Sequence, residues 1–282
     1  MIQKISVIGA GTMGRGIAFA CALSGLAVSV QDKFEQSIEG CRDYITKQFN
    51  KSVEKGKLSR QEADERKGNI QYFQELEGAV RQADLVIEAV PEVMELKVDT
   101  FKEMDRYAPA DAILATNTST MSPTEISAQT SRPDRCIALH FFNPVPKMKL
   151  IEVICGLETS ERTIEESFQF GESIGKECVK INEFPGFAVS RMNCLIGNEA
   201  MNMVMEGVGS VEDIDKAMNL GLNHPMGPLE LADLVGLDTR LRNMEYLHKT
   251  LGEKYRPCPV LTKYVKAGHL GKKTGKGFYT YS

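Results

Sequence analysis

Residues 4–32 read KISVIGAGTMGRGIAFACALSGLAVSVQD, and this stretch decides the fold. A short run rich in β-branched residues leads into a glycine-rich turn, and an amphipathic helical pattern follows until Gly25. Residues 27–30 predict a second strand, with Asp32 at its end. Strand, turn, helix and strand in this order form a βαβ unit, so the stretch predicts an α/β domain built on a mostly parallel sheet.

The turn carries glycines at the spacing G-x-G-x-x-G. In a Rossmann-like domain Gly9 would allow the tight turn, Gly11 would let a pyrophosphate approach the backbone, and Gly14 would let the helix pack closely. The start of that helix presents backbone N–H groups to the phosphates, which places Thr12 and Met13 in the predicted cofactor site. The alternative interpretation is a glycine turn in a nucleotide-free α/β fold. It is less favoured because the complete βαβ frame surrounds the turn.

Asp32 indicates which dinucleotide the turn would bind. A carboxylate at the end of the second strand accepts hydrogen bonds from the adenosine ribose and repels a 2′-phosphate, so the sequence predicts NAD rather than NADP. The neighbouring cation, Lys33, weakens that preference slightly.

A helical hairpin, which we call the arm, is predicted over about residues 36–68 as an insertion in this domain. Gly56 interrupts the first helical pattern, and Ser59 with Glu62 forms a capping box that starts the second helix. Lys51 and Lys55 lie one turn apart on the polar face of the arm. They are either solvated surface lysines or a clamp for phosphate groups.

Two further buried strands are predicted in ADLVIEAVPE, residues 83–92, and DAILATNTST, residues 111–120. Glu92 follows the first run, and Asn117 and Ser119 follow the second. Ligands of open α/β sheets bind beyond the carboxyl ends of the strands, so these three side chains are expected near the cofactor and substrate. Ser119 could also be an ordinary turn serine, since no G-x-S-x-G motif surrounds it.

The segments RCIALHFF and MKLIEVIC are predicted to pair as antiparallel strands about Val145 and Pro146. This register places His140 opposite Glu152 on one face of the sheet. A carboxylate there would fix the imidazole tautomer and stabilise the imidazolium, as a general base near neutral pH requires. A buried structural pair without catalytic function is the alternative, and only proximity to the cofactor favours the first interpretation.

Composition restricts the class of protein. The chain has 282 residues, of which 42% are hydrophobic and 26% charged, which predicts an ordinary two-domain globular protein. No apolar run approaches the roughly 18 residues of a membrane span, and the net charge of -4 argues against nucleic-acid binding. Seven cysteines without a CxxC pair indicate reduced thiols rather than disulfides or a metal site. We therefore expect a cytoplasmic protein that binds neither membrane nor metal.

The pattern becomes helical near Pro185 and stays helical to the end of the chain. We expect residues 1–184 to form the NAD-binding domain and residues 185–282 an all-α domain. In that domain Ser210 is predicted to cap one helix, and Pro228 to open the next. A helical segment of this length holds a limited core by itself, so a homodimer through this domain is expected.

Six motifs spread along the chain resemble the 3-hydroxyacyl-CoA dehydrogenases, particularly their short bacterial 3-hydroxybutyryl-CoA type: VIGAGTMGRGIA, NTSTMSPTEI, HFFNPVPKMKLIEVI, PGFAVSR, NHPMGPLELADLVGLD and GKKTGKGFYTY. The resemblance covers essentially the whole chain. It implies reversible hydride transfer between carbon 3 of an (S)-3-hydroxyacyl-CoA and NAD, in a protein that is commonly dimeric.

The resemblance also implies roles for single residues. His140 matches the base for the hydroxyl proton, Glu152 its orienting partner, and Ser119 the hydroxyl that hydrogen-bonds the substrate oxygen. Glu92, Lys97 and Asn117 match positions that contact the nicotinamide half of NAD, and Ser119 and Asn143 are also expected to contact the cofactor. The positions expected to contact the substrate are Asn143, Ser190, Lys51 and Lys55, the two lysines through the CoA phosphates. One position departs from the family, because Ser190 stands where PGFxxNR usually has asparagine.

Two other functions remain open from the sequence. One is a dehydrogenase of a free hydroxy or sugar acid, since the lens-crystallin-like gulonate enzymes resemble this fold. The other is a non-catalytic NAD-binding redox sensor or structural protein. The β-hydroxyacid dehydrogenases are disfavoured because PGFAVSRMN lacks their lysine. The acyl chain length, and the choice between fatty-acid oxidation and butyrate-type synthesis, are not decided.

Overall fold

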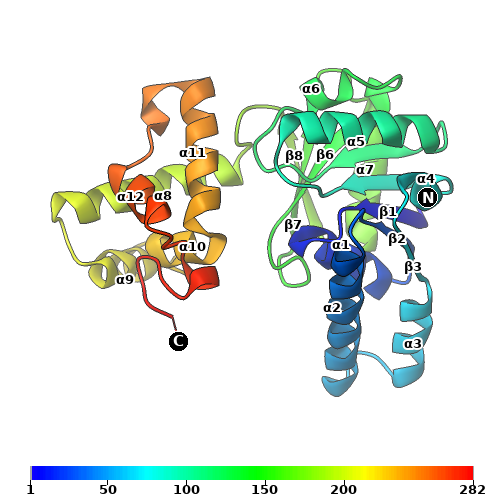
Figure 1. The fold of residues 1–282 in the computed structure, drawn as a ribbon, viewed down its shortest axis with the longest axis horizontal. Helices are drawn as coiled ribbons and strands as arrows, with labels where there is room; N and C mark the ends of the chain where they lie inside the picture. The colour runs from blue at the N-terminus through cyan, green and yellow to red at the C-terminus, as the bar shows by residue number, and fades with distance from the viewer. Residues whose placement is uncertain (1, 282) are drawn as a thin grey trace. The chain divides into compact units, whose positions relative to one another are not determined.

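The structure is a computed structural model that describes residues 2–281. The chain divides into two compact units after Glu183, one residue before the boundary expected from the sequence. The first unit is an α/β domain and the second is helical, as Figure 1 shows, so the predicted fold class is confirmed.

The N-terminal unit is built on one eight-stranded sheet in the order β3-β2-β1-β4-β5-β6-β7-β8. Neighbouring strands are parallel except β6 and β7, which pair antiparallel and reverse the direction for β7 and β8. The sequence pattern missed β3 and β8, which are short or largely exposed. The strands are β1 (Lys4–Ile8), β2 (Ala27–Gln31), β3 (Ile70–Phe73), β4 (Leu85–Glu88), β5 (Ile113–Thr116), β6 (Cys136–Phe141), β7 (Leu150–Cys155) and β8 (Glu177–Asn182).

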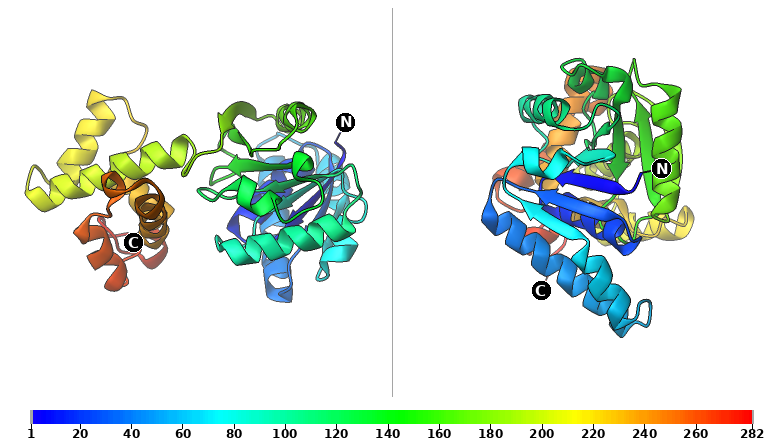
Figure 2. Two further views of the ribbon diagram at one scale, coloured as in Figure 1. Left: turned by 90° about the horizontal axis from the view of Figure 1, so that it is seen from above. Right: turned by 90° about the vertical axis from the view of Figure 1, so that its right-hand side faces the viewer.

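Helices cover both faces of this sheet, as the right-hand view of Figure 2 shows. The larger core lies between the strands and helices α1, α2 and α7, and the smaller core lies under α4, α5 and α6. Strands buried on both faces explain the nearly continuous apolar runs in the sequence. The helices of this unit are α1 (Thr12–Leu23), α2 (Glu35–Glu54), α3 (Arg60–Gly68), α4 (Leu76–Val80), α5 (Met94–Tyr107), α6 (Pro123–Ser127), the 3-10 turn Pro133–Arg135, and α7 (Glu161–Ser173).

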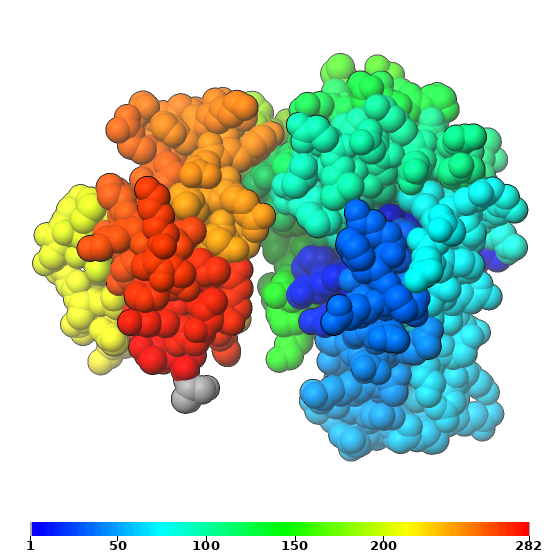
Figure 3. Space-filling model, viewed as in Figure 1, coloured from blue at the N-terminus to red at the C-terminus, as the bar shows by residue number. Residues whose placement is uncertain are grey.

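The arm consists of α2 and α3, which pack side by side. Ser59 accepts a hydrogen bond from the backbone of Glu62, whose carboxylate accepts one from the backbone of Ser59, so the predicted capping box is confirmed. In Figure 3 the arm, blue to light blue, stands out from the N-terminal unit. Lys51 and Lys55 are exposed near its tip.

The C-terminal unit contains five α-helices around one apolar core. Ser210 accepts a hydrogen bond from the backbone of Asp213 at the start of α9, and Pro228 is the first residue of α10, so both predicted helix starts are confirmed. The elements are α8 (Val189–Glu206), α9 (Val211–Gly221), α10 (Pro228–Val235), α11 (Leu237–Leu251) and α12 (Pro259–Lys266), with 3-10 turns at Glu253–Tyr255 and Lys272–Thr274.

A fully buried carboxylate fastens the last residues of the chain to α10. The two oxygens of Asp233 accept hydrogen bonds from the backbone N–H groups of Phe278 and Tyr279, at 3.0 and 2.9 Å, and from the Tyr281 hydroxyl at 3.0 Å. A Cβ atom on Gly277 would lie 2.0 Å from the same carboxylate, so only glycine fits there. The GKGFYTY motif is therefore a packing motif of this unit.

Candidate active site

The glycine turn has the geometry that its spacing predicts. Gly9 adopts a φ of +101°, and a Cβ atom there would lie 2.7 Å from the carbonyl oxygen of Ala89. A Cβ on Gly14 would lie 1.7 Å from the carbonyl oxygen of Gly9, so the helix packs directly on the turn. A Cβ on Gly11 would meet no atom within 4 Å, which leaves space beside the backbone where a phosphate group fits.

Asp32 joins the glycine turn to the end of β2. Its two carboxylate oxygens accept hydrogen bonds from the backbone N–H groups of Ala10, at 2.9 Å, and Phe34, at 3.0 Å. A carboxylate offers about four acceptor positions, so two remain for the hydroxyl groups of a ribose. Asp32 therefore shapes the turn in addition to the ribose contact expected from the sequence.

The start of α1 supports the same cofactor. Gly11 caps this helix, and within residues 2–281 no side chain caps its N-terminus. The open N–H groups and the positive end of the helix dipole suit a pyrophosphate. Thr12 is exposed and Met13 half-buried at this end. The residues of the turn thus fit a dinucleotide.

His140 and Glu152 face each other across β6 and β7, as predicted. His140 Nδ1 lies 2.7 Å from Glu152 Oε2, with His140 4% exposed and Glu152 fully buried. Because a carboxylate can only accept, Nδ1 carries the proton, and Nε2 is the nitrogen that can take up another. The Phe142 ring packs against the imidazole, with the ring centres 4.4 Å apart.

Ser119 lies in the loop that follows β5, and Glu92 holds this loop. Glu92 Oε1 accepts a hydrogen bond from the Thr118 hydroxyl at 2.6 Å and another from the backbone N–H of Ser119 at 2.8 Å. Burial alone would raise the pKa of Glu92, but Lys97 and these two donors outweigh it and hold the pKa below its usual value. Glu92 thus remains an ionised anchor for the backbone of Ser119.

Lys97 is buried behind Glu92 rather than exposed at a ligand site. Its ammonium contacts Glu88 at 2.9 Å and Glu92 at 3.1 Å, and its side chain is 1% exposed. Glu88, which the sequence analysis did not single out, also accepts a hydrogen bond from the Thr116 hydroxyl at 2.7 Å. The sequence signal that could have identified Glu88 was its charge inside an apolar strand run. Lys97 would therefore act on a cofactor through Glu92.

The remaining predicted residues lie in four places. Asn117 Oδ1 accepts a hydrogen bond from the backbone N–H of Phe141 at 2.9 Å, which ties the end of β5 to the strand of His140. Asn143 is exposed in the turn after β6. Lys51 and Lys55 belong to the arm, and Ser190 is half-buried in the first turn of α8 in the C-terminal unit.

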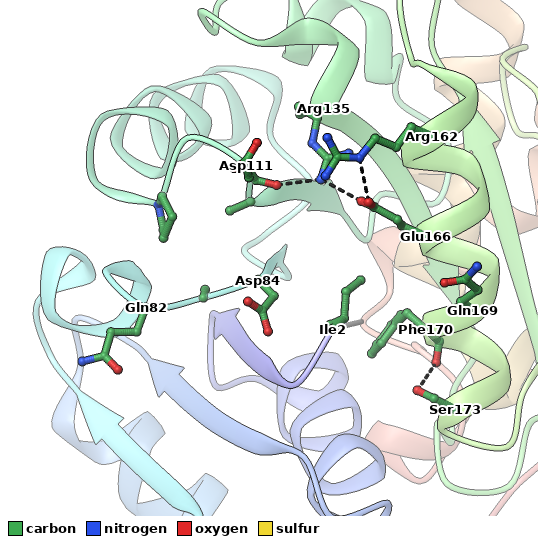
Figure 4. Close-up of a pocket in the computed structure, with 13 residues that line it drawn as sticks. Ile2, Gln82, Asp84, Asp111, Arg135, Arg162, Glu166, Gln169, Phe170 and Ser173 are labelled. Carbon is green, nitrogen blue, oxygen red and sulfur yellow. Dashed lines mark hydrogen bonds and ion pairs between the residues drawn. The ribbon is translucent and has the colours of Figure 1, made fainter.

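A cleft of about 230 Å³ opens at the other end of the strands. Figure 4 shows Arg135 and Arg162 directed toward Glu166 in this cleft, which Asp84 and Asp111 also line. Its loops precede β4, β5 and β6, whereas ligands of such sheets bind beyond the carboxyl ends. Arg135 and Arg162 both pair with Glu166, and the carboxylate of Asp84 accepts hydrogen bonds from the backbone of residues 3 and 4.

Metal ligands form no cluster here: residues 2–281 contain no group of three or more His, Cys, Asp or Glu side chains placed to hold an ion. None of the helices in the same range is both long and apolar enough to cross a membrane.

Comparison with known proteins agrees with this geometry. The profile of the 3-hydroxyacyl-CoA dehydrogenase NAD-binding domain matches residues 4–184, and the profile of the C-terminal domain of the same family matches residues 186–281. A 3-hydroxybutyryl-CoA dehydrogenase of Clostridioides difficile is 45% identical over 281 residues, which are 99% of this chain and 100% of the relative.

Solved structures give the same result. The (S)-3-hydroxybutyryl-CoA dehydrogenase of Ralstonia eutropha has a TM-score of 0.95 at 41% identity and is matched over 100% of each chain. A diketoreductase that acts on dicarbonyl compounds has a TM-score of 0.85 at 31% identity over 99% of each chain. Because both profiles and the full-length relative agree, the chain belongs to the 3-hydroxyacyl-CoA dehydrogenase family, and its N-terminal unit is the NAD-binding domain of that family.

Proposed function

We propose that this protein catalyses the reversible, NAD-dependent oxidation of an (S)-3-hydroxyacyl-CoA to the 3-oxoacyl-CoA, with 3-hydroxybutyryl-CoA as its principal substrate. One observation carries the proposal: a buried imidazole with a carboxylate at 2.7 Å lies on β6 of an NAD-binding domain. Two of the relatives named above, from Clostridioides difficile and Ralstonia eutropha, are 3-hydroxybutyryl-CoA dehydrogenases, which supports a short acyl chain.

Three residues of the N-terminal unit have separate roles in the proposed reaction. Nε2 of His140 takes the proton from the substrate hydroxyl, and Glu152 stabilises the imidazolium that results. The Ser119 hydroxyl donates a hydrogen bond to the same substrate oxygen. The glycine turn and Asp32 would hold NAD, which would supply the acceptor for the hydride of carbon 3. In the reverse direction His140 returns the proton to the ketone oxygen.

The test compares NADH oxidation with acetoacetyl-CoA, free acetoacetate and a longer 3-oxoacyl-CoA. Turnover of acetoacetyl-CoA with little turnover of the free acid supports the proposal. The likeness to the diketoreductase makes a free dicarbonyl substrate the second candidate, and faster turnover of acetoacetate would favour it. Inactivity on all three substrates would favour an NAD-binding sensor.

Replacing Lys51 and Lys55 by alanine is expected to raise KM for acetoacetyl-CoA about tenfold. Each exposed charge contact contributes about 0.5–1 kcal/mol, and about 1.4 kcal/mol corresponds to a factor of ten. Initial rates measured from low to high salt should also show a weaker salt dependence in the variant, because phosphate contacts are screened.

A double variant of two other exposed lysines, Lys67→Ala with Lys102→Ala, controls for the lost charge. Each control lysine pairs with an aspartate three residues before it on its own helix, so the double variant should leave KM unchanged. A short thioester without the nucleotide should be used equally well by all these proteins. If its KM rises as much as that of acetoacetyl-CoA, Lys51 and Lys55 do not bind the CoA phosphates.

Replacing Asp32 by alanine is expected to lower the preference for NADH over NADPH about tenfold, or about 1.4 kcal/mol. The change removes both the ribose acceptor and the charge that repels a 2′-phosphate. Because Asp32 also holds the backbone of Ala10 and Phe34, KM for NADH should rise in the same variant.

Asp32→Asn separates these two effects. Its amide keeps one acceptor for the turn but has no negative charge, so the NADH/NADPH ratio of kcat/KM should still fall while KM for NADH rises less. An unchanged ratio in both variants would remove the assignment of Asp32 to cofactor choice.

We further propose a cytoplasmic homodimer that forms through the C-terminal unit. An apolar hollow of about 300 Å³ lies among α8, α9 and α10, lined by Leu195, Ile196, Ala200, Met203, Ile214 and Met218. Leu220 and Leu222, at the end of α9, are 77% and 64% exposed. An exposed apolar surface of this kind is typical of an interface with a second copy of the chain in a symmetric dimer. Light scattering should give the mass of two chains.

A further inference from the structure

The loop that carries Ser119 is fastened at its far end by Glu183, the last residue of the N-terminal unit. Glu183 follows β8, and its backbone N–H donates to the carbonyl of Cys155 on β7 at 3.2 Å, so the sheet fixes its position. Its side-chain oxygens accept hydrogen bonds from the hydroxyl groups of Ser122 and Thr124. The backbone N–H of Thr124 donates to the same carboxylate at 3.3 Å.

Both hydroxyl groups also bind the surrounding backbone. The Ser122 oxygen accepts a hydrogen bond from the N–H of Glu125 at 3.0 Å and so caps α6. The Thr124 oxygen accepts one from the N–H of Leu157 at 2.8 Å, after β7. Each hydroxyl donates its single proton to Glu183, so both depend on an acceptor there. Among residues 2–281 no lysine or arginine forms an ion pair with this carboxylate.

The loop between Thr118 and Ser122 is therefore held at both ends by carboxylates, Glu92 at the first end and Glu183 at the second. Glu92 also accepts a hydrogen bond from the backbone N–H of Ser119, and only Thr120 and Met121 separate Ser119 from Ser122 at the second anchor. Displacement of a reacting group by about 1 Å can lower a rate about 100-fold. Loss of the second anchor can therefore shift the Ser119 hydroxyl away from the substrate oxygen through a short stretch of loop.

Glu183 also begins the segment that connects the two units. Gly186 and Phe187 follow with φ angles of +79° and +50°, and Phe187 is a non-glycine residue in the left-handed region, a conformation that the surrounding structure must hold. The backbone N–H of Phe187 donates to the carbonyl of Phe184 at 2.9 Å, which makes the connector a defined turn. Glu183, which holds the Ser119 loop, directly precedes this turn.

We propose that Glu183 is a positioning residue, which sets the place of the Ser119 hydroxyl by fixing Ser122 and Thr124 and so couples the connector between the units to the substrate-binding loop. The inference rests on the proposed contact between Ser119 and the substrate oxygen. Glu183 itself contacts no reacting atom in this scheme.

A double-mutant cycle with Ser119→Ala and Glu183→Ala tests the inference through kcat for acetoacetyl-CoA reduction. Glu183→Ala alone should lower kcat about 10- to 100-fold with little change in KM for NADH. Glu183→Gln, which keeps the shape and one acceptor oxygen, should lower kcat less. In the Ser119→Ala background, Glu183→Ala should lower kcat less than about twofold, because the group that it positions is gone.

Glu177→Ala is the matched control. Glu177 is the first residue of β8, the strand that Glu183 follows, and its side chain is 80% exposed, so this variant should keep wild-type kcat. Equal losses from Glu183→Ala in both backgrounds, or no loss in either, would overturn the inference. If Glu183→Ala fails to fold, the double-mutant cycle is measured with Glu183→Gln in its place, and the same outcomes test the inference. If Ser119→Ala retains full activity, the proposed substrate contact of Ser119 fails instead, which separates the two hypotheses.

Discussion

Replacing His140 by asparagine is expected to lower kcat about 100- to 10,000-fold, the usual contribution of a general acid-base group. Asparagine places an amide nitrogen where Nδ1 of His140 stands, so the side chain can still donate to Glu152, which is fully buried. The variant lacks the outer part of the imidazole ring, including Nε2, the nitrogen that we propose moves the proton. Stopped-flow or steady-state NADH oxidation with acetoacetyl-CoA measures the loss.

Two comparisons separate chemistry from folding. His248→Asn changes an imidazole whose contact is an exposed glutamate, Glu253, in the C-terminal unit, and it should keep wild-type kcat. His140→Ala should be less stable than His140→Asn, because it removes the donor to a buried carboxylate. NADH binding, followed by fluorescence, should change little in His140→Asn. Turnover within about tenfold of the wild type would assign the pair to structure alone.

Replacing Glu152 by glutamine is expected to lower kcat by about 100-fold or more. The corresponding exchange of carboxylate for amide in a serine-protease triad costs about 10,000-fold, because the imidazole takes the wrong tautomer. Here the glutamine amide can donate to Nδ1, which moves the imidazole proton to Nε2, and the neutral amide cannot stabilise the imidazolium. The measurement is kcat with saturating NADH and acetoacetyl-CoA.

Glu166→Gln provides the matched control for Glu152→Gln. Glu166 also accepts hydrogen bonds from two cationic side chains, Arg135 and Arg162, but at the opposite ends of the strands. The Glu166→Gln variant should have a lower melting temperature and an unchanged kcat. Near-normal turnover of Glu152→Gln together with lower stability would mean that Glu152 serves packing rather than catalysis.

The pairing of His140 with Glu152 could be predicted because antiparallel strands give a fixed sum of residue numbers. The observed partners Ala138 with Ile154 and Leu139 with Val153 have the same sum as His140 with Glu152, which centres the turn on Pro146. The glycine turn could be predicted for a similar reason, since each glycine answers a local steric requirement within a few residues. Local geometry of this kind is contained in a short stretch of sequence.

Features that depend on burial or on distant segments could not be predicted in the same way. Lys97 was expected at the cofactor from the family resemblance, but the sequence does not reveal that its side chain, on α5, is buried against Glu88 on β4. The half-exposed pattern of β8 resembles a surface segment because β8 is an edge strand. The contact of Glu183 with Ser122 spans 61 positions of sequence, and only the completed sheet brings the two together.

The hydrogen-bond donors of Asp233 determine which unit can complete its folding first during synthesis on the ribosome. Its donors come from residues 278–281, so the hydrogen bonds that compensate the burial of Asp233 cannot form until those residues have been translated. The N-terminal sheet is complete at Asn182, about a hundred residues earlier in the chain. The nascent NAD-binding domain can therefore fold while its helical companion is still open to chaperones and proteases.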